Sequence, residues 1–121
     1  MKHTVRLKGV IVGHSELENA DRGVRRAWGA FRPGVGYELV EPIFRLFSEA
    51  VPPNGGARDE AKLARYHGAR DKLGLELVDA AGRQIRTTTI HIADYRDDSA
   101  DGRIELDVLI SDEQYWSHRD S

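Results

Sequence analysis

The alternation of apolar and polar positions predicts strands near both ends of the chain and helices between them. Residues 4–12 first alternate and then become nearly all apolar, which is typical of a strand that enters a core. Residues 13–23 are polar and rich in turn formers, so they predict a connection, with one helical turn capped by Ser15 as a candidate. The apolar spacing in residues 24–31 fits a helical turn or a bulged strand, and we favour the strand.

Two helices are predicted in the middle of the chain. Proline suits the first turn of a helix and disfavours helical backbone before it, so one helix should begin at about Pro42. Its apolar stripe ends at the proline- and glycine-rich residues 52–56. A second helix should run from Asp59, whose charge suits the positive end of the helix dipole, to Gly74, a typical helix stop.

The last third of the chain has the alternation of β structure. Residues 75–79 and 84–95 flank a glycine-containing turn and predict a hairpin. Ile85 and Ile90 are an odd number of residues apart, so in a regular strand their side chains would point to opposite faces of the sheet. This indicates a bulge between them. Residues 103–110 alternate cleanly and predict a strand with one buried face.

The predicted order is therefore strand, strand, helix, helix, strand, strand, strand. Short connections favour antiparallel pairing, so we expect an α+β fold in which about five antiparallel strands carry two helices on one face. A length of 121 residues fits one domain, and we expect a single globular domain over residues 1–121 with a short tail from about residue 112. Tyr115 and Trp116 predict that this tail packs on the domain or on a second copy.

Composition narrows the class of protein. Hydrophobic residues make up 40% of the chain and charged residues 31%, which is a globular balance. There is no cysteine, no apolar run of about 20 residues and no secretory signal pattern at the start. We therefore expect a cytoplasmic protein without a membrane partner or a cofactor.

The net charge of -2 conceals an uneven distribution. Residues 1–93 contain 15 Lys and Arg and 11 Asp and Glu, a net of +4, whereas residues 94–121 contain 3 and 9, a net of -6. Nucleic-acid binding requires a broad positive face, so this distribution disfavours it. It permits a local anion site on one side, and it also permits head-to-tail pairing between unlike faces of two copies.

The first candidate site is a metal loop with Asp97, Ser99, Asp101 and Glu105. The pattern Asp-x-Ser-x-Asp-Gly places oxygen ligands and a glycine as at the start of a calcium loop. Val108 stands where that motif requires a bidentate glutamate, and the flanks predict strands rather than helices. An acidic hairpin loop is therefore the favoured interpretation.

The second candidate site combines His14, Glu16 and Glu18 at the end of the first strand. Imidazole and carboxylate groups at close spacing can transfer protons or bind a metal. His91 and Asp94, near the end of another strand, would complete the set if the two strand ends were neighbours. A polar loop with a capping serine is the simpler interpretation.

The third candidate is the segment 22–37, which combines arginines with aromatic residues and contains no acid. Such residues recognise phosphate, carboxylate or a protein surface. The candidate binding residues are Arg22, Arg25, Arg26, Trp28, Arg32 and Tyr37. The alternative is that Trp28 and Phe31 belong to the core and the arginines are solvated.

No P-loop, dinucleotide-binding, zinc-protease or nucleophile-elbow signature occurs in the chain. The sequence therefore favours a non-enzymatic binding or protein-interaction module that uses segment 22–37. Its partner would be an acidic protein, a small anionic ligand or a second copy in a homodimer. The alternative is a small metal-dependent or acid/base enzyme with the His14 and His91 groups in one cleft.

Overall fold

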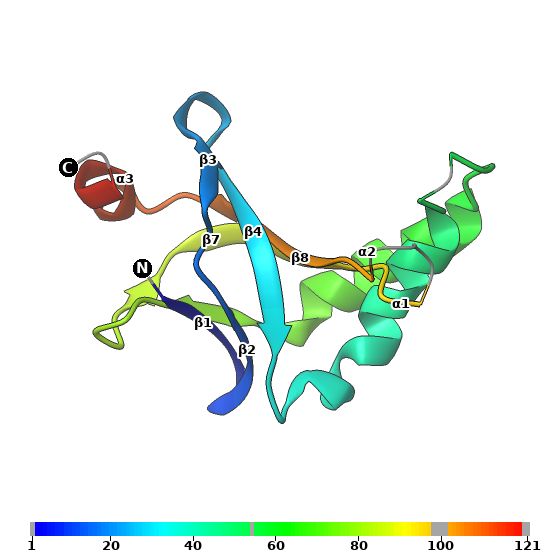
Figure 1. Ribbon diagram of the computed structural model, residues 1–121, viewed down its shortest axis with the longest axis horizontal. Helices are drawn as coiled ribbons and strands as arrows, with labels where there is room; N and C mark the ends of the chain where they lie inside the picture. The colour runs from blue at the N-terminus through cyan, green and yellow to red at the C-terminus, as the bar shows by residue number, and fades with distance from the viewer. Residues whose placement is uncertain (1, 54, 98–101, 120–121) are drawn as a thin grey trace.

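The computed structural model describes residues 2–53, 55–97 and 102–119, and the strands of this part form one antiparallel sheet (Figure 1). The strands are β1 (His3–Leu7), β2 (Val10–Ser15), β3 (Asn19–Asp21), β4 (Arg26–Pro33), β5 (Glu76–Val78), β6 (Gln84–Ile85), β7 (Thr87–Asp94) and β8 (Ile104–Ile110). The helices are α1 (Glu41–Ala50), α2 (Glu60–Leu73) and α3 (Glu113–Arg119), and two 3-10 turns are η1 (Arg22–Val24) and η2 (Tyr37–Leu39). Among the described residues, no helix is both long enough and apolar enough to cross a lipid bilayer.

The sheet curls into a nearly closed barrel. Its strand order is β6-β5-β1-β2-β4-β8-β7, and β3 is added outside this path on β4. β6 and β7 are successive parts of one strand that is interrupted at Arg86, so the two ends of the order meet through the chain itself. The carboxylate of Asp112 holds the interruption by accepting a hydrogen bond from the Arg86 amide at 3.2 Å. The inside of the curled sheet therefore becomes the core.

This architecture corrects the predicted fold. A sheet of about five strands with two helices on one face is wrong: the described residues form an eight-stranded, barrel-like sheet with three helices. Residues 4–12 are two strands, because Lys8 and Gly9 adopt positive φ angles of 49° and 83° and reverse the chain. The predicted connection 13–23 contains the end of β2 and the edge strand β3. The sheet closes because β5 pairs with both β1 and β6.

Other local predictions are confirmed. The first helix begins one residue before Pro42, and the second follows Asp59, whose side chain accepts a hydrogen bond from the Lys62 amide at 3.0 Å. The second helix ends at Gly74, which has a left-handed φ of 70°. Residues 26–33 form a strand, and the bulge predicted between Ile85 and Ile90 occurs as a shift in the β7–β8 register between Thr87 and Thr89. Ser15 caps a turn rather than a helix, since its Oγ accepts from the Leu17 amide.

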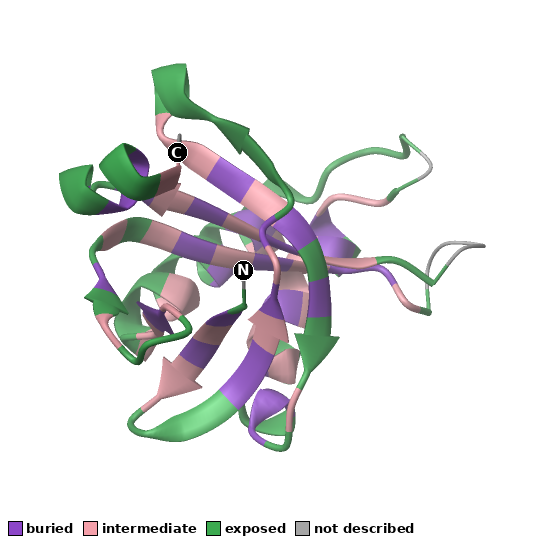
Figure 2. Cartoon of the chain, turned by 60° about the vertical axis from the view of Figure 1, so that its left-hand side comes forward, coloured by how far each residue is buried: buried purple, intermediate pink, exposed green. Residues whose placement is uncertain are grey.

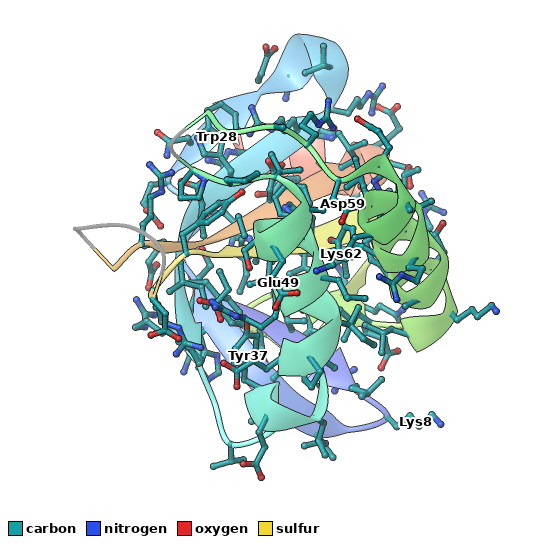
Figure 3. The ribbon with its side chains drawn as sticks, turned by 90° about the vertical axis from the view of Figure 1, so that its right-hand side faces the viewer. Lys8, Trp28, Tyr37, Glu49, Asp59 and Lys62 are labelled. Atoms are coloured by element: carbon teal, nitrogen blue, oxygen red, sulfur yellow. The ribbon has the colours of Figure 1, made fainter. Side chains whose placement is uncertain are left out.

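The core fills the barrel, and α1 and α2 cover the outer face of β7. Along β7, Ile90 and Ile92 are buried inside the barrel, while His91 between them points outward. The His91 ring lies against Phe47 of α1, with 4.3 Å between the ring centroids. The two helices are tied to each other by an ion pair of 3.1 Å between Glu49 and Lys62 (Figure 3). Figure 2 shows buried positions alternating mainly with intermediate ones along the strands of the barrel.

The aromatic pair near the C-terminus packs on the barrel, which is one of the two alternatives that the sequence predicts. Tyr115 and Trp116 of α3 are buried, and the Trp116 indole Nε1 donates a hydrogen bond of 2.8 Å to the Ile110 carbonyl. Arg22 donates to the Trp116 carbonyl, and Arg25 pairs with Glu113 at 2.5 Å. The helix is therefore fixed to the barrel end on both its apolar and its polar sides.

Candidate functional site

Four aliphatic side chains form an exposed apolar patch where the β1–β2 turn meets the loop before α1. Val10 and Ile11 of β2 are 40% and 42% exposed, Leu39 of η2 is 59% exposed, and Val35 is 88% exposed. Figure 2 shows the exposed start of β2 at the rim of the barrel. We call Val10, Ile11, Val35 and Leu39 the apolar patch. A cluster of this kind on a folded surface is typical of an interaction site.

Backbone hydrogen bonds hold the two halves of the apolar patch together. The amides of Gly34 and Gly36 donate to the carbonyls of Val12 and Ile11 at 2.7 and 2.9 Å. A Cβ at Gly36 would lie 2.7 Å from Val10 Cγ1 and 2.6 Å from the Ile11 carbonyl oxygen. Glycine at this position therefore allows the loop to approach the strand closely, and the patch is preformed.

A second feature is a cavity of about 490 Å³ between α3 and the adjoining end of the barrel. We call it the end cavity. Its lining includes His3, residues 16–18, Asp79, Arg83, Tyr115 and Arg119. His118 of α3 completes it. Charged, aromatic and aliphatic groups from four separate chain segments therefore meet in one place.

The sequence-predicted acid–base residues do not gather in one cleft. His14 of β2 accepts or donates a hydrogen bond of 3.0 Å with Thr4 Oγ1 across the β1–β2 pair. Partial burial, and then the nearby Lys2 and Arg32, lower the His14 pKa. Glu16 and Glu18 instead line the end cavity.

His91 and Asp94 lie elsewhere and in different surroundings. His91 contacts the Tyr66 hydroxyl through Nδ1, and burial lowers the His91 pKa to about 4. Asp94 is fully buried and accepts a hydrogen bond of 2.7 Å from the Tyr37 hydroxyl. Its carboxylate also takes two hydrogen bonds, of 3.0 and 2.8 Å, from Arg96. Burial raises the Asp94 pKa, but the hydrogen bonds from Arg96 and Tyr37 outweigh it and hold that pKa below its usual value.

The arginine and aromatic residues of segment 22–37 are also distributed over several contacts. Arg26 makes a two-point contact with Asp107, at 2.9 and 2.6 Å, and its guanidinium lies 4.2 Å from the Trp28 ring centroid. Trp28 is half-buried on the outer face of β4, where Figure 3 labels it. Arg32 is exposed and pairs with Glu16 at 3.4 Å. The six predicted binding residues therefore do not share one surface, since Tyr37 is in the core and Arg22 and Arg25 anchor α3.

The predicted calcium loop falls partly outside the described residues. Ser99 and Asp101 lie outside the described residues, so the structure places only Asp97 and Glu105 of the motif. Asp97 lies 3.9 Å from Arg45, and Glu105 stands in β8 opposite Ala93 of β7. In the described ranges, no three His, Asp or Glu side chains are grouped closely enough to hold a metal ion.

Sequence reasoning missed the apolar patch, although two signals were present. Val10, Ile11 and Val12 are consecutive, and successive strand residues point to opposite faces, so they cannot all enter one core. Val35 stands between two glycines in a turn, where it has little structure to pack against. The end cavity had no such signal, because it exists only where α3 docks on the barrel.

Comparison with protein-family models, with curated proteins and with solved structures finds no match to the chain. Functional proposals therefore depend on the geometry of the apolar patch and the end cavity.

Proposed function

We propose that the chain is a protein-interaction module that pairs with a second copy of itself through the apolar patch. The observation that carries this proposal is the exposure of four aliphatic side chains side by side on a rigid part of the fold. Removing apolar surface from water contributes roughly 25 cal/mol per Å². A preformed patch also loses little conformational entropy on binding, because its backbone is already ordered.

Charge supports a second copy as the partner. Lys8 lies in the β1–β2 turn at one end of the apolar patch and points away from the body of the molecule (Figure 3). Glu38 is exposed in η2, next to Leu39 of the patch. A two-fold axis through the patch would bring Lys8 of each copy to Glu38 of the other, and such an interface is self-complementary.

The proposed function is still a protein-interaction module, as the sequence favours, but the binding surface is the apolar patch instead of the arginine and aromatic residues of segment 22–37. Arg25 and Arg26 already pair with Glu113 and Asp107 within the chain, so they contribute to the fold. Segment 22–37 still takes part through Val35, which belongs to the same loop.

Acidic substitutions in the apolar patch are expected to abolish the dimer. Val35→Glu or Leu39→Glu places two like charges in a desolvated interface, so the dimer dissociation constant should rise at least tenfold, which corresponds to about 1.4 kcal/mol. Val24→Glu is the matched control, because Val24 is also 59% exposed but lies in η1, which follows β3. Figure 1 shows β3 at the top and the β1–β2 turn at the bottom. Sedimentation velocity at several protein concentrations measures the effect.

The expected result is a dimer for the wild type and Val24→Glu and a monomer for the two patch variants. A wild-type protein that stays monomeric up to a concentration of roughly 1 mM would contradict the proposal, because its dimer dissociation constant would then exceed the millimolar range. So would a Val35→Glu variant that sediments like the wild type.

A further inference from the structure

We propose that the end cavity is a binding site for a free α-amino acid with an apolar side chain. Pockets that take small molecules typically span about 300–1,000 Å³, and the end cavity falls within this range at about 490 Å³. It lies at the α3 end of the barrel, away from the apolar patch, so this proposal does not depend on the proposed dimer.

The floor of the end cavity is aromatic and aliphatic. Leu17, His3 and Tyr115 are all buried, and the rings of His3 and Tyr115 lie 5.7 Å apart at a tilt of 57°. Such a floor favours an apolar side chain over a polar one, because a polar group there would lose its bonds to water.

The charged groups of the end cavity fall into two sets. Arg83 pairs with Asp79 at 3.5 Å, and Glu16 pairs with Arg32 at 3.4 Å, so these charges are compensated. Among the residues that the structure describes, Arg119 contacts only neutral oxygens: it donates hydrogen bonds of 2.6 Å to the Tyr115 hydroxyl and 2.6 Å to the Leu17 carbonyl.

Glu18 is the corresponding acid. Its Oε2 accepts a hydrogen bond of 3.1 Å from the Ala30 amide, and in the part of the chain that the structure describes it pairs with no cation. Within residues 2–53, 55–97 and 102–119, the end cavity thus presents one uncompensated guanidinium, that of Arg119, and one uncompensated carboxylate, that of Glu18, which do not pair with each other.

Both charges lie beside Leu17, since Arg119 contacts its carbonyl and Glu18 is the next residue. A ligand that satisfies both needs a carboxylate for Arg119 and an ammonium group for Glu18, close together. An α-amino acid carries these two groups on one carbon. Its side chain would then extend over Leu17, His3 and Tyr115.

The walls that hold these groups are fixed before any ligand binds. Leu17 has a left-handed φ of 45°, and its amide is held by Ser15 Oγ at 3.0 Å. Trp116 anchors α3 through its bond to the Ile110 carbonyl. A preorganised site of this kind loses little affinity to ordering of the protein.

The test is an NMR titration of the full chain, ¹⁵N-labelled, with three probes. L-leucine carries both head groups, N-acetyl-L-leucine lacks the ammonium, and L-leucinamide lacks the carboxylate. L-leucine should shift amide signals of residues 16–18, 79–83 and 115–119 in a saturable manner. Each blocked probe should bind about tenfold to a hundredfold more weakly, because one charge-assisted contact is lost.

Two variants assign each head group to its residue. With Arg119→Gln, L-leucine and L-leucinamide should bind equally, because the carboxylate no longer has its cation. With Glu18→Gln, which keeps the oxygen for the Ala30 amide, L-leucine and N-acetyl-L-leucine should bind equally. The matched controls are Arg65→Gln and Glu60→Gln on the exposed side of α2, and they should leave all three affinities unchanged.

The proposal is overturned if L-leucine gives no saturable shift up to roughly 10 mM, a concentration that detects millimolar affinity. It is also overturned if the blocked probes bind the wild type as well as L-leucine does. If Arg119→Gln loosens α3 and lowers the melting temperature, the Glu18→Gln comparison decides alone, since that substitution leaves α3 untouched.

Discussion

Replacing Asp94 with alanine is expected to lower the free energy of unfolding by about 1–3 kcal/mol, because the buried Tyr37 hydroxyl would lose its charged acceptor and Arg96 would lose one of its carboxylate partners. The carboxylate is fully buried and takes hydrogen bonds from Tyr37 of η2 and from Arg96 beyond β7. Arg45 of α1 lies 3.8 Å from the same carboxylate. Without the Asp94 carboxylate, the Tyr37 hydroxyl and the Arg96 guanidinium lose their common acceptor, while the hydrogen bond from Arg45 to the backbone carbonyl of residue 94 remains.

Chemical denaturation monitored by circular dichroism measures this loss. Asp71→Ala is the matched control, because Asp71 is exposed and pairs with its neighbour Arg70, so the loss of stability should stay within about 0.5 kcal/mol. If the two variants were equally stable, Asp94 would not join η2, α1 and β7.

The same carboxylate gives the fold a defined pH dependence. Because the folded-state pKa of Asp94 is lowered, its contribution to stability is complete above the unfolded pKa of about 3.9. That contribution is lost as the pH falls through the folded-state pKa. The Asp94→Ala variant lacks this contribution, so the difference in stability between it and the wild type should shrink in strongly acidic solution.

Replacing Trp116 with alanine is expected to cost about 3–5 kcal/mol of unfolding free energy, the usual range for removing a buried large aromatic residue. The indole is 3% exposed and donates to the Ile110 carbonyl at the end of β8. Loss of the indole removes its packing against the barrel and leaves the Ile110 carbonyl without this hydrogen-bond donor. We therefore expect α3 to detach before the barrel unfolds.

Urea unfolding followed by circular dichroism checks the stability, and limited proteolysis of residues 112–119 checks the detachment. Gln114→Ala is the control, because this side chain is exposed on the same helix. A Trp116→Ala protein as stable as Gln114→Ala would show that α3 does not belong to the core.

The sequence predicts the local elements better than their assembly. Pro42, Asp59 and Gly74 mark helix ends by properties of single residues, so these predictions hold. The Lys8–Gly9 turn is hidden, because lysine seldom adopts a positive φ and the apolar run continues past it. Closure of the barrel depends on β1 pairing with β5, where Val5 meets Leu77 far along the chain. No local pattern encodes a contact at that separation.

The candidate sites divide in the same way. Sequence reasoning identifies residues that can carry chemistry, such as Glu18, His91 and Arg26, but their partners come from distant segments. Asp107 compensates Arg26, whereas Glu18 and Arg119 line the same cavity, without pairing in the described structure, because α3 folds back on the barrel end. Which charges are compensated is therefore a property of the tertiary structure alone.

Sedimentation velocity of charge-reversal variants tests the proposed dimer most directly. Lys8→Glu alone and Glu38→Lys alone should each weaken association, because each would place like charges opposite one another across the two-fold axis. An equimolar mixture of these two variants should sediment as a dimer again, since every contact across the axis then joins opposite charges. If the mixture stays as dissociated as its components while the wild type is dimeric, the two copies do not pair through the apolar patch in the proposed orientation.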